Sequence, residues 1–359
     1  MKFETLNCRT DFTLEGAYKK LRKRKILELA NVLGVEISFT QKNGESLVDI
    51  YRPFLNNTGK IVLSRQNEAL SVKMARYVLD HIRGILMNTS KWEVKLIRDI
   101  VEAGPQKSVG RLGERLPCIL FDILQIKIRE KGFDGMRYYA MADDLHMAIG
   151  EYAAQLLSDP EYLAQTERLQ FCRGLLTLYG AMPLLALYKR LNVEYPDNEE
   201  LNRRVLASPE LVHYYVDIPS KRDNPYVECI FLHNVFDSSS SMLEQIKDNK
   251  RIEFPHNFVL TAGLLPYPLF AISERDRFYD ILMDRFGVKR SKIDRLMYYA
   301  WLNKQNKDYR FTSGYDLLSE LKINFRFNEL GYLLELIEDF GNAVPCWVKN
   351  GNPIGERWL

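Results

Sequence analysis

Six basic residues occupy seven consecutive positions near the start of the sequence: Lys19, Lys20, Arg22, Lys23, Arg24 and Lys25. The whole protein has 50 Lys and Arg residues against 47 Asp and Glu residues, so the run is a local concentration of charge in a nearly neutral chain. Clustered cations bind the phosphates of a polyanion, which gives affinity and salt dependence without reading a base sequence. The run therefore predicts a nucleic-acid-binding surface. The alternative is a solvated surface that Glu15 and Glu28 partly neutralise.

The residues that follow predict the helix that carries this run. Residues 17–33 place Ile26, Leu29 and Leu33 at helical spacing, and Gly34 ends the pattern as a C-terminal cap does. On one helix, the cations lie around most of the circumference. They also lie near the N-terminus of this predicted helix, where the unfavourable interaction of each cation with the helix dipole costs about 0.3–1 kcal/mol. A polyanion offsets this repulsion.

The segment from Lys23 to Leu55 resembles the small helix–turn–helix unit at the N-terminus of transcription terminator Rho and in SAP-type modules, in which LxxLAxxLGI precedes a Lys-containing turn and a second short helix. The matching positions are Leu29, Ala30, Leu33, Gly34, Val35, Lys42, Leu47 and Ile50. The resemblance implies a basic nucleic-acid-binding module over residues 1–60, with Lys42 among its contacts.

The spacing of Gly, Pro, Asn and Asp predicts a mainly α fold with short β-hairpins. Ser90 and Glu93 predict a capping box before a helix that ends at Gly104. Helices and then a hairpin, IKIRE and RYYAMA, follow in the order of a winged-helix unit, and Arg129, Lys131 and Arg137 on this hairpin are candidate contacts to a DNA backbone.

A similar order recurs further along, with VHYYVDI and YVECIFL as a second candidate wing; whether this is a true repeat stays open. The expected organisation has four parts: residues 1–60 as the basic module, 61–160 as helices with the first winged-helix-like unit, 161–240 as the second such unit, and 241–359 as a C-terminal helical domain with a Trp-containing tail.

The C-terminal region resembles a set of uncharacterised bacterial and phage proteins whose helical body ends in an NNTxxW…GxTPxE element. The corresponding residues are Gly341, Asn342, Trp347, Gly351, Pro353 and Glu356. Some members begin with a Rho-like module, and some end in a Cys-rich zinc tail like that of SecA; the sequence in hand shows no such tail, so the resemblance implies no metal. Trp347 and Trp358 are candidate anchors for a protein partner, and packing of the tail is the alternative.

Motifs for nucleotide binding, nucleophilic catalysis and metal binding are missing from the sequence, which contains no GxxxxGK[ST], GxGxxG, GxSxG, HExxH or CxxC. Cys229 and His233 could ligate a metal, but a buried free thiol is the simpler reading. Asp143, Asp144 and His146 form the densest titratable cluster, for which helix capping is the simpler explanation. We therefore expect no cofactor and no metal, and we favour a protein that is not an enzyme; a catalytic site assembled from dispersed residues is the remaining alternative.

The longest apolar runs are shorter than the roughly 18–20 residues of a membrane span, and the first residues do not read as a secretion signal. We therefore expect a cytoplasmic protein without a membrane partner, whose five cysteines are free thiols. The sequence favours a non-enzymatic nucleic-acid-binding or regulatory protein of bacterial or phage type. The alternative is a protein-interaction or inhibitor scaffold that acts on another protein without touching nucleic acid.

Overall fold

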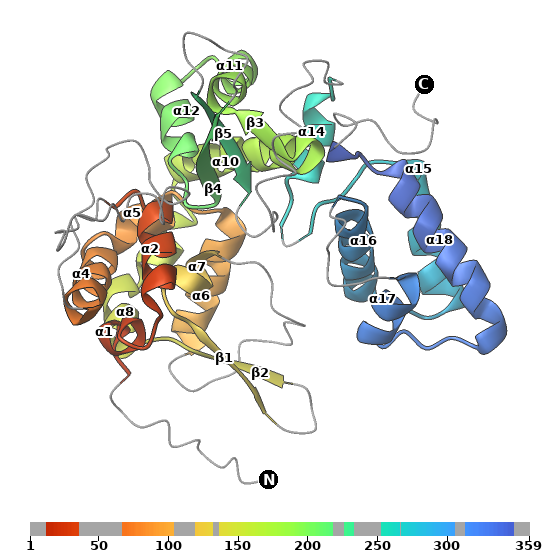
Figure 1. Ribbon diagram of the computed structural model, residues 1–359, viewed down its shortest axis with the longest axis horizontal. Helices are drawn as coiled ribbons and strands as arrows, with labels where there is room; N and C mark the ends of the chain where they lie inside the picture. Colours follow the sequence, from red (N-terminus) through yellow and green to blue (C-terminus); the bar gives the residue numbers. More distant parts are fainter. Residues whose placement is uncertain are drawn as a thin grey trace. The chain divides into compact units, whose positions relative to one another are not determined.

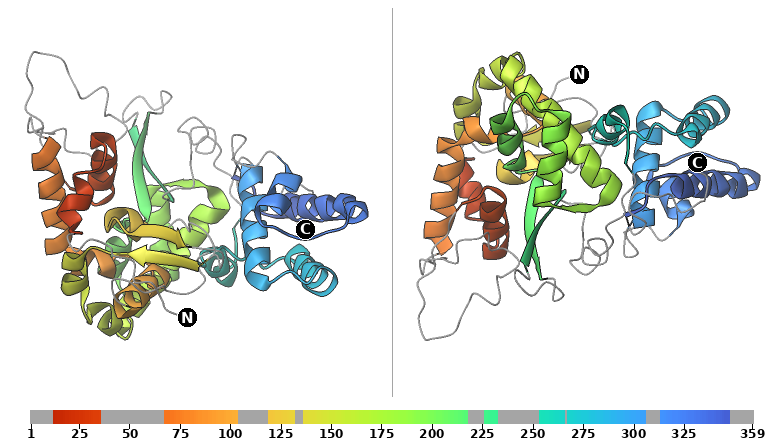
Figure 2. Two further views of the ribbon diagram at one scale, coloured as in Figure 1. Left: turned by 90° about the horizontal axis from the view of Figure 1, so that it is seen from below. Right: turned by 90° about the horizontal axis from the view of Figure 1, so that it is seen from above.

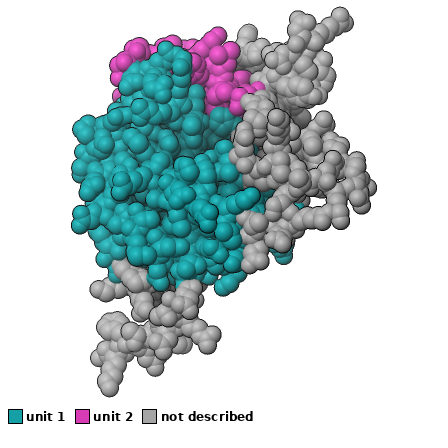
Figure 3. All heavy atoms as spheres, turned by 90° about the vertical axis from the view of Figure 1, so that its left-hand side faces the viewer, with its two compact units in different colours: residues 1–169, 198–215 teal, residues 170–197, 216–359 magenta. Residues whose placement is uncertain are grey.

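The computed structural model describes residues 12–35, 67–103, 119–131, 136–217, 226–232, 253–265, 267–305 and 313–347. The chain forms two compact units, unit 1 with residues 1–169 and 198–215 and unit 2 with residues 170–197 and 216–359 (Figure 3). Helices dominate both units, which confirms the mainly α fold (Figures 1 and 2). None of the helices in these ranges combines the length and apolar character of a membrane span. The division into four domains stays a prediction.

Unit 1 consists of short helices and one hairpin. Its elements are α1 (Leu14–Tyr18), α2 (Lys23–Val32), α4 (Asn67–Asp80), α5 (Ile82–Met87), α6 (Lys91–Ala103), α7 (Ile119–Ile123), β1 (Lys127–Lys131), β2 (Met136–Ala140), α8 (Asp143–Ile149), α9 (Tyr152–Leu156), the start of α10 (Pro160–Tyr179), α12 (Glu199–Leu206) and the start of β4 (Leu211–Asp217). Gly150, at φ +44°, separates α8 from α9.

The core of unit 1 lies where α4 contacts α1, α2 and α8. Apolar side chains from all of these helices are buried in it, among them Leu14, Ile26, Met74 and Leu145. The two short helices near the N-terminus therefore pack against the rest of unit 1 and share its core. Each buried Leu or Ile contributes about 1.5–3 kcal/mol through the hydrophobic effect.

The first predicted hairpin is confirmed. Strands β1 and β2 pair antiparallel, with Lys127 opposite Ala140 and Glu130 opposite Arg137. At its base, the Lys127 ammonium lies 4.2 Å from the centroid of the Phe12 ring, a cation–π contact that ties the hairpin to the residues before α1.

Unit 2 contains the end of α10 and a C-terminal helical region. Its further elements are β3 (Ala181–Pro183), α11 (Leu184–Glu194), the end of β4, β5 (Tyr226–Leu232), α14 (His256–Ala262), α15 (Ser273–Asp280), the π-helical turn η2 (Ile281–Arg285), α16 (Arg290–Gln305), α17 (Gly314–Glu320), the 3₁₀ turn η3 (Phe327–Glu329) and α18 (Leu330–Ala343). Helices α15, α16 and α17 each contact α18. Strands β4 and β5 match the second predicted strand pair.

Strand β3 is an element that the sequence pattern does not predict. It pairs antiparallel with β5, Met182 opposite Ile230, and gives a three-stranded sheet of order β3-β5-β4. Gly180 and Pro183 are read from the sequence as the end of one helix and the start of the next, but the residues between them are extended. The first hairpin, by contrast, is a two-stranded sheet.

Helices α10 and α14 approach each other closely in unit 2 at two glycines. A Cβ atom on Gly174 would lie 1.9 Å from the Val259 carbonyl oxygen, and one on Gly263 would lie 1.9 Å from the Gln170 carbonyl oxygen. The Gln170 side chain spans the same contact, because its Nε2 donates to the Leu260 carbonyl oxygen at 2.8 Å. Only residues without a side chain fit at these two positions.

Candidate nucleic-acid interface

The six basic residues lie on a corner between two helices and not along one helix. Helix α1 ends at Tyr18, the chain turns through Lys20 and Leu21, and α2 begins at Lys23 with Arg22 as its N-cap. The prediction of a single helix over residues 17–33 is therefore wrong in its first part. We call residues 19–25 the basic corner. Mutual repulsion of six cations disfavours a continuous helix there, and the turn lets the chain bury apolar residues on both sides.

Helix α1 is held in place at both ends. At its start, the Leu14 backbone N–H donates to both carboxylate oxygens of Asp144, at 3.1 Å each, while Thr13 caps the helix by accepting from the Gly16 backbone N–H. At its end, the buried Tyr18 hydroxyl donates to the Ile123 carbonyl oxygen at 2.8 Å. Burial, with a smaller contribution from Asp122, raises the pKa of Tyr18, so the phenol stays protonated. Helices α8 and α7 thus fix the first side of the corner.

Three of the cations form ion pairs at the protein surface: Lys19 with Glu15 at 2.8 Å, Arg24 with Glu28 at 3.2 Å and Lys25 with Asp122 at 2.9 Å. Exposed pairs of this kind contribute at most about 1 kcal/mol each, so phosphate can compete for these cations. Neutralisation by Glu15 and Glu28, the alternative that the sequence leaves open, therefore accounts for part of the run.

Lys20 and Arg22 are exposed, and neither forms an ion pair with a residue in the described ranges. Lys23, Arg24 and Lys25 occupy the first turn of α2, which contains no acidic residue and has no side-chain cap. Cations at this end oppose the helix dipole by about 0.3–1 kcal/mol each. The unfavourable electrostatics expected from the sequence are thus present in the structure.

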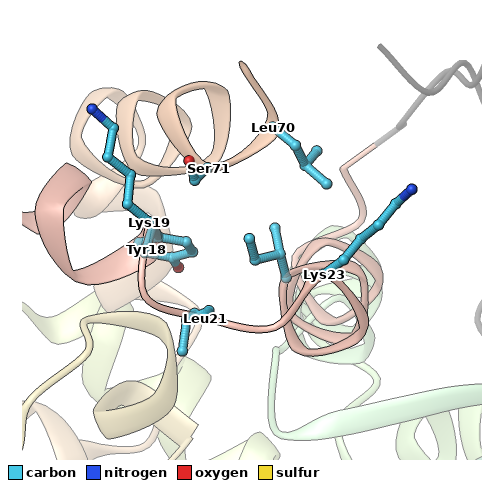
Figure 4. Close-up of a pocket in the computed structure, with 7 residues that line it drawn as sticks. Tyr18, Lys19, Leu21, Lys23, Leu70 and Ser71 are labelled. Carbon is cyan, nitrogen blue, oxygen red and sulfur yellow. The ribbon is translucent and has the colours of Figure 1, made fainter. Parts of the chain in front are cut away.

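A pocket of about 280 Å³ opens at the basic corner (Figure 4). Its lining residues come from α1, the turn, α2 and α4, and they are Tyr18, Lys19, Leu21, Lys23, Ile26, Leu70 and Ser71. Figure 4 shows Lys19 and Lys23 on opposite sides of the pocket, with their ammonium groups directed outward. Leu70 and Ser71 are not among the candidate residues predicted from the sequence. Their local sequence carries no signal of a binding site, and only the packing of α4 against the basic corner brings them to the pocket.

The remaining candidate nucleic-acid contacts lie in two places. Arg129 and Lys131 are on β1 and Arg137 is on β2, so the hairpin brings all three onto one element. The base of this hairpin contacts Phe12, which precedes α1, whereas the basic corner begins at the end of α1. Lys42 lies outside the described residues.

Of the two tryptophans considered as partner anchors, Trp358 lies outside the described residues and Trp347 is completely buried. Its indole Nε1–H donates to the Thr177 carbonyl oxygen at 2.8 Å, and its ring meets that of Trp301 edge-on at a centroid distance of 5.5 Å. In this structure, Trp347 packs inside unit 2 and offers no surface to a partner. This arrangement corresponds to packing of the tail, the alternative that the sequence leaves open.

The acidic cluster and the metal candidates have local structural explanations. Asp144 caps α1 from a distance, and it also accepts from the Leu145 backbone N–H at 3.0 Å. Burial lowers the pKa of the neighbouring His146. Cys229 is buried in β5, and among the described residues no group of three or more His, Cys, Asp or Glu side chains could hold a metal ion.

Comparison with models of known protein families, with curated proteins and with solved structures finds no match for this chain. The resemblances to the Rho N-terminal module and to the NNTxxW…GxTPxE proteins therefore stay predictions. The assignment of the basic corner depends on its own geometry and charge.

Proposed function

We propose that this chain is a non-enzymatic nucleic-acid-binding or regulatory protein that contacts phosphates through the basic corner. The observation that carries the proposal is the exposure of Lys20 and Arg22 on a turn whose flanking helices are fixed to the core of unit 1. Neither cation has to break an ion pair with a described residue before it binds a phosphate, so no such competing contact reduces the electrostatic gain. The corner is therefore suited to backbone contacts, which need charge more than base recognition.

The structure sets bounds on the salt dependence. If all six cations of the run contact duplex phosphates, the slope of log affinity against log salt approaches about −5, at about −0.9 per contact. If only Lys20 and Arg22 do so, the slope is about −2. A slope between these values supports binding through the corner.

The proposal includes the β1–β2 hairpin as a wing, with Arg129, Lys131 and Arg137 as secondary backbone contacts. Support comes from its antiparallel pairing and from the contact between Lys127 and Phe12, which attaches the hairpin to the residues before α1. Winged-helix units use such hairpins beside a DNA-contacting helix. The Rho-like reading of residues 1–60 belongs to the same proposal, with the second helix and Lys42 outside the described residues.

The test compares two double charge reversals in unit 1. Lys20→Glu with Arg22→Glu changes the corner, and Lys91→Glu with Lys95→Glu makes the same change in net charge at two exposed positions of α6. Binding of single-stranded and duplex oligonucleotides is measured by fluorescence anisotropy over a range of salt concentrations. We expect the corner variant to lose at least about tenfold in affinity and about 2 units of salt slope, and the α6 variant to change little.

Equal losses in the two variants would mean that net charge, not the corner, drives binding. Absence of binding by the unmodified chain at low salt would refute the proposal. The alternative function is a protein-interaction or inhibitor scaffold. It predicts that the unmodified chain does not bind nucleic acid at low salt, and that a protein partner co-purifies with it and stays bound at high salt. Exposed apolar side chains such as Phe327, which is 92% exposed, are where such a partner would be sought.

A further inference from the structure

We infer that the pocket at the basic corner receives one unstacked nucleobase of a single strand while the neighbouring phosphates lie on the cations around it. This inference rests on the proposed function and extends it, since it names single-stranded nucleic acid as the preferred form. It follows from the combination of apolar lining residues with a cation on either side of the pocket.

The lining of the pocket defines the chemistry of its occupant. Leu21, Ile26 and Leu70 contribute apolar surface, and Lys19 and Lys23 stand on opposite sides of it (Figure 4). A ligand that satisfies both features has an apolar body flanked by negative charge on two sides. In a polynucleotide, a base lies between its 5′ and 3′ phosphates and has this arrangement.

A duplex cannot present such a group, because its bases are stacked and paired inside the helix and expose only their edges in the grooves. Entry into the pocket therefore requires an unstacked base, which a single strand provides at little cost.

The size of the pocket agrees with one base. Its volume of about 280 Å³ lies just below the range of about 300–1,000 Å³ of sites that enclose a whole small molecule. A base fits inside while its sugar and phosphates stay at the rim. This places the phosphates beside Lys19 and Lys23, which stand on opposite sides of the pocket.

The side chains that line the pocket predict weak base preference. Tyr18 is completely buried, and its hydroxyl already donates to the Ile123 carbonyl oxygen, so it does not donate to a base. Contacts with Leu21, Ile26 and Leu70 depend on shape and apolar area, which all bases share. The pocket is therefore expected to accept any base that fits.

The experiment uses the full chain and two short oligonucleotides with the same number of phosphates, a single strand that carries bases and an abasic strand that carries none. A base that buries its surface against Leu21, Ile26 and Leu70 gains hydrophobic binding energy, so the chain should prefer the strand with bases by at least about fivefold. Leu21→Trp fills the pocket from the half-exposed turn and should abolish that preference while leaving the salt slope unchanged. Leu70→Phe fills it from α4 and is the second variant.

The matched control is Leu185→Trp, the same substitution at a 62% exposed position of α11, which should keep the preference. Equal binding of the two strands by the unmodified chain overturns the pocket inference and leaves the phosphate-binding function intact. Retention of the preference by both folded pocket variants also overturns it. Binding to a duplex of the same length but to neither strand overturns the pocket inference, whereas absence of binding to all three at low salt overturns the proposed function itself.

Discussion

The contact between α10 and α14 makes Gly174→Ala a sharp test of the packing of unit 2. The added Cβ would lie 1.9 Å from the Val259 carbonyl oxygen, whereas ordinary contacts of this kind begin at 3.4 Å. Because 3.4 minus 1.9 is 1.5, the two backbones must separate by about 1.5 Å in this direction. No side-chain rotation relieves the overlap, since both partners are backbone.

The expected loss of stability combines three contributions. Overpacking of this kind costs about 1–3 kcal/mol. Separation of the helices also stretches the hydrogen bond from Gln170 to the Leu260 carbonyl oxygen, which is 2.8 Å long and contributes about 1 kcal/mol. The better helix propensity of alanine returns about 1 kcal/mol. We therefore expect Gly174→Ala to lower the free energy of unfolding by about 1–3 kcal/mol.

Gly331→Ala is the matched control, because this helical glycine of α18 has no atom within 4 Å of the site of an added Cβ. That variant should gain about 0.5–1 kcal/mol. Both changes are read out by urea unfolding followed by tryptophan fluorescence in a Trp92→Phe background, which removes the tryptophan of unit 1 and keeps the buried Trp301 and Trp347 of unit 2. If Gly174→Ala proves as stable as the unmodified chain while Gly331→Ala gains stability, the close approach of α10 and α14 is refuted.

Three further changes test other contacts. Asp144→Ala removes the acceptor of the Leu14 backbone N–H and should cost about 1 kcal/mol in urea unfolding, whereas Asp143→Ala at the exposed neighbour should cost less. Trp347→Phe keeps an aromatic ring but leaves the Thr177 carbonyl oxygen without its indole donor, and should lower the unfolding free energy by about 1–3 kcal/mol; an unchanged urea midpoint would contradict this. Burial lowers the pKa of His146 below its unfolded value of about 6.5, so protonation favours the unfolded chain and stability falls as the pH drops below about 6.5. In urea unfolding measured above and below this pH, His146→Gln should make the loss of stability smaller.

Patterns within one segment predict several of the helices, where spacing and capping are decided locally. Asn198, a residue type that favours helix starts, precedes α12, and its side-chain oxygen accepts from the Leu201 backbone N–H at 2.9 Å. The two hairpin strands of unit 1 also follow from alternation and turn residues in a short stretch. Strand β3 was missed because only three residues form it, and its pairing with β5 comes from far along the chain.

Contacts between distant residues explain the other differences. Glu93 is read as the partner of Ser90 in a capping box, but its carboxylate accepts from the Ile119 and Leu120 backbone N–H groups at 3.1 and 3.2 Å and so caps α7. The Ser90 backbone N–H donates instead to Glu210, at 2.6 Å. A local pattern identifies a carboxylate suited to a helix start, but only the fold decides which helix it serves.

The basic corner depends both on a local sequence pattern and on contacts that only the fold creates. The six cations are evident in the sequence, yet the same residues on one continuous helix would point in all directions and only a part could face one ligand. The turn through Lys20 and Leu21 changes this, because it places cations from the end of α1 and the start of α2 around a common pocket. Leu21, the one apolar residue that interrupts the run, lines that pocket. The break in the charge pattern is therefore as informative as the charges, since it marks both the turn and the apolar surface beside which a phosphate backbone would lie.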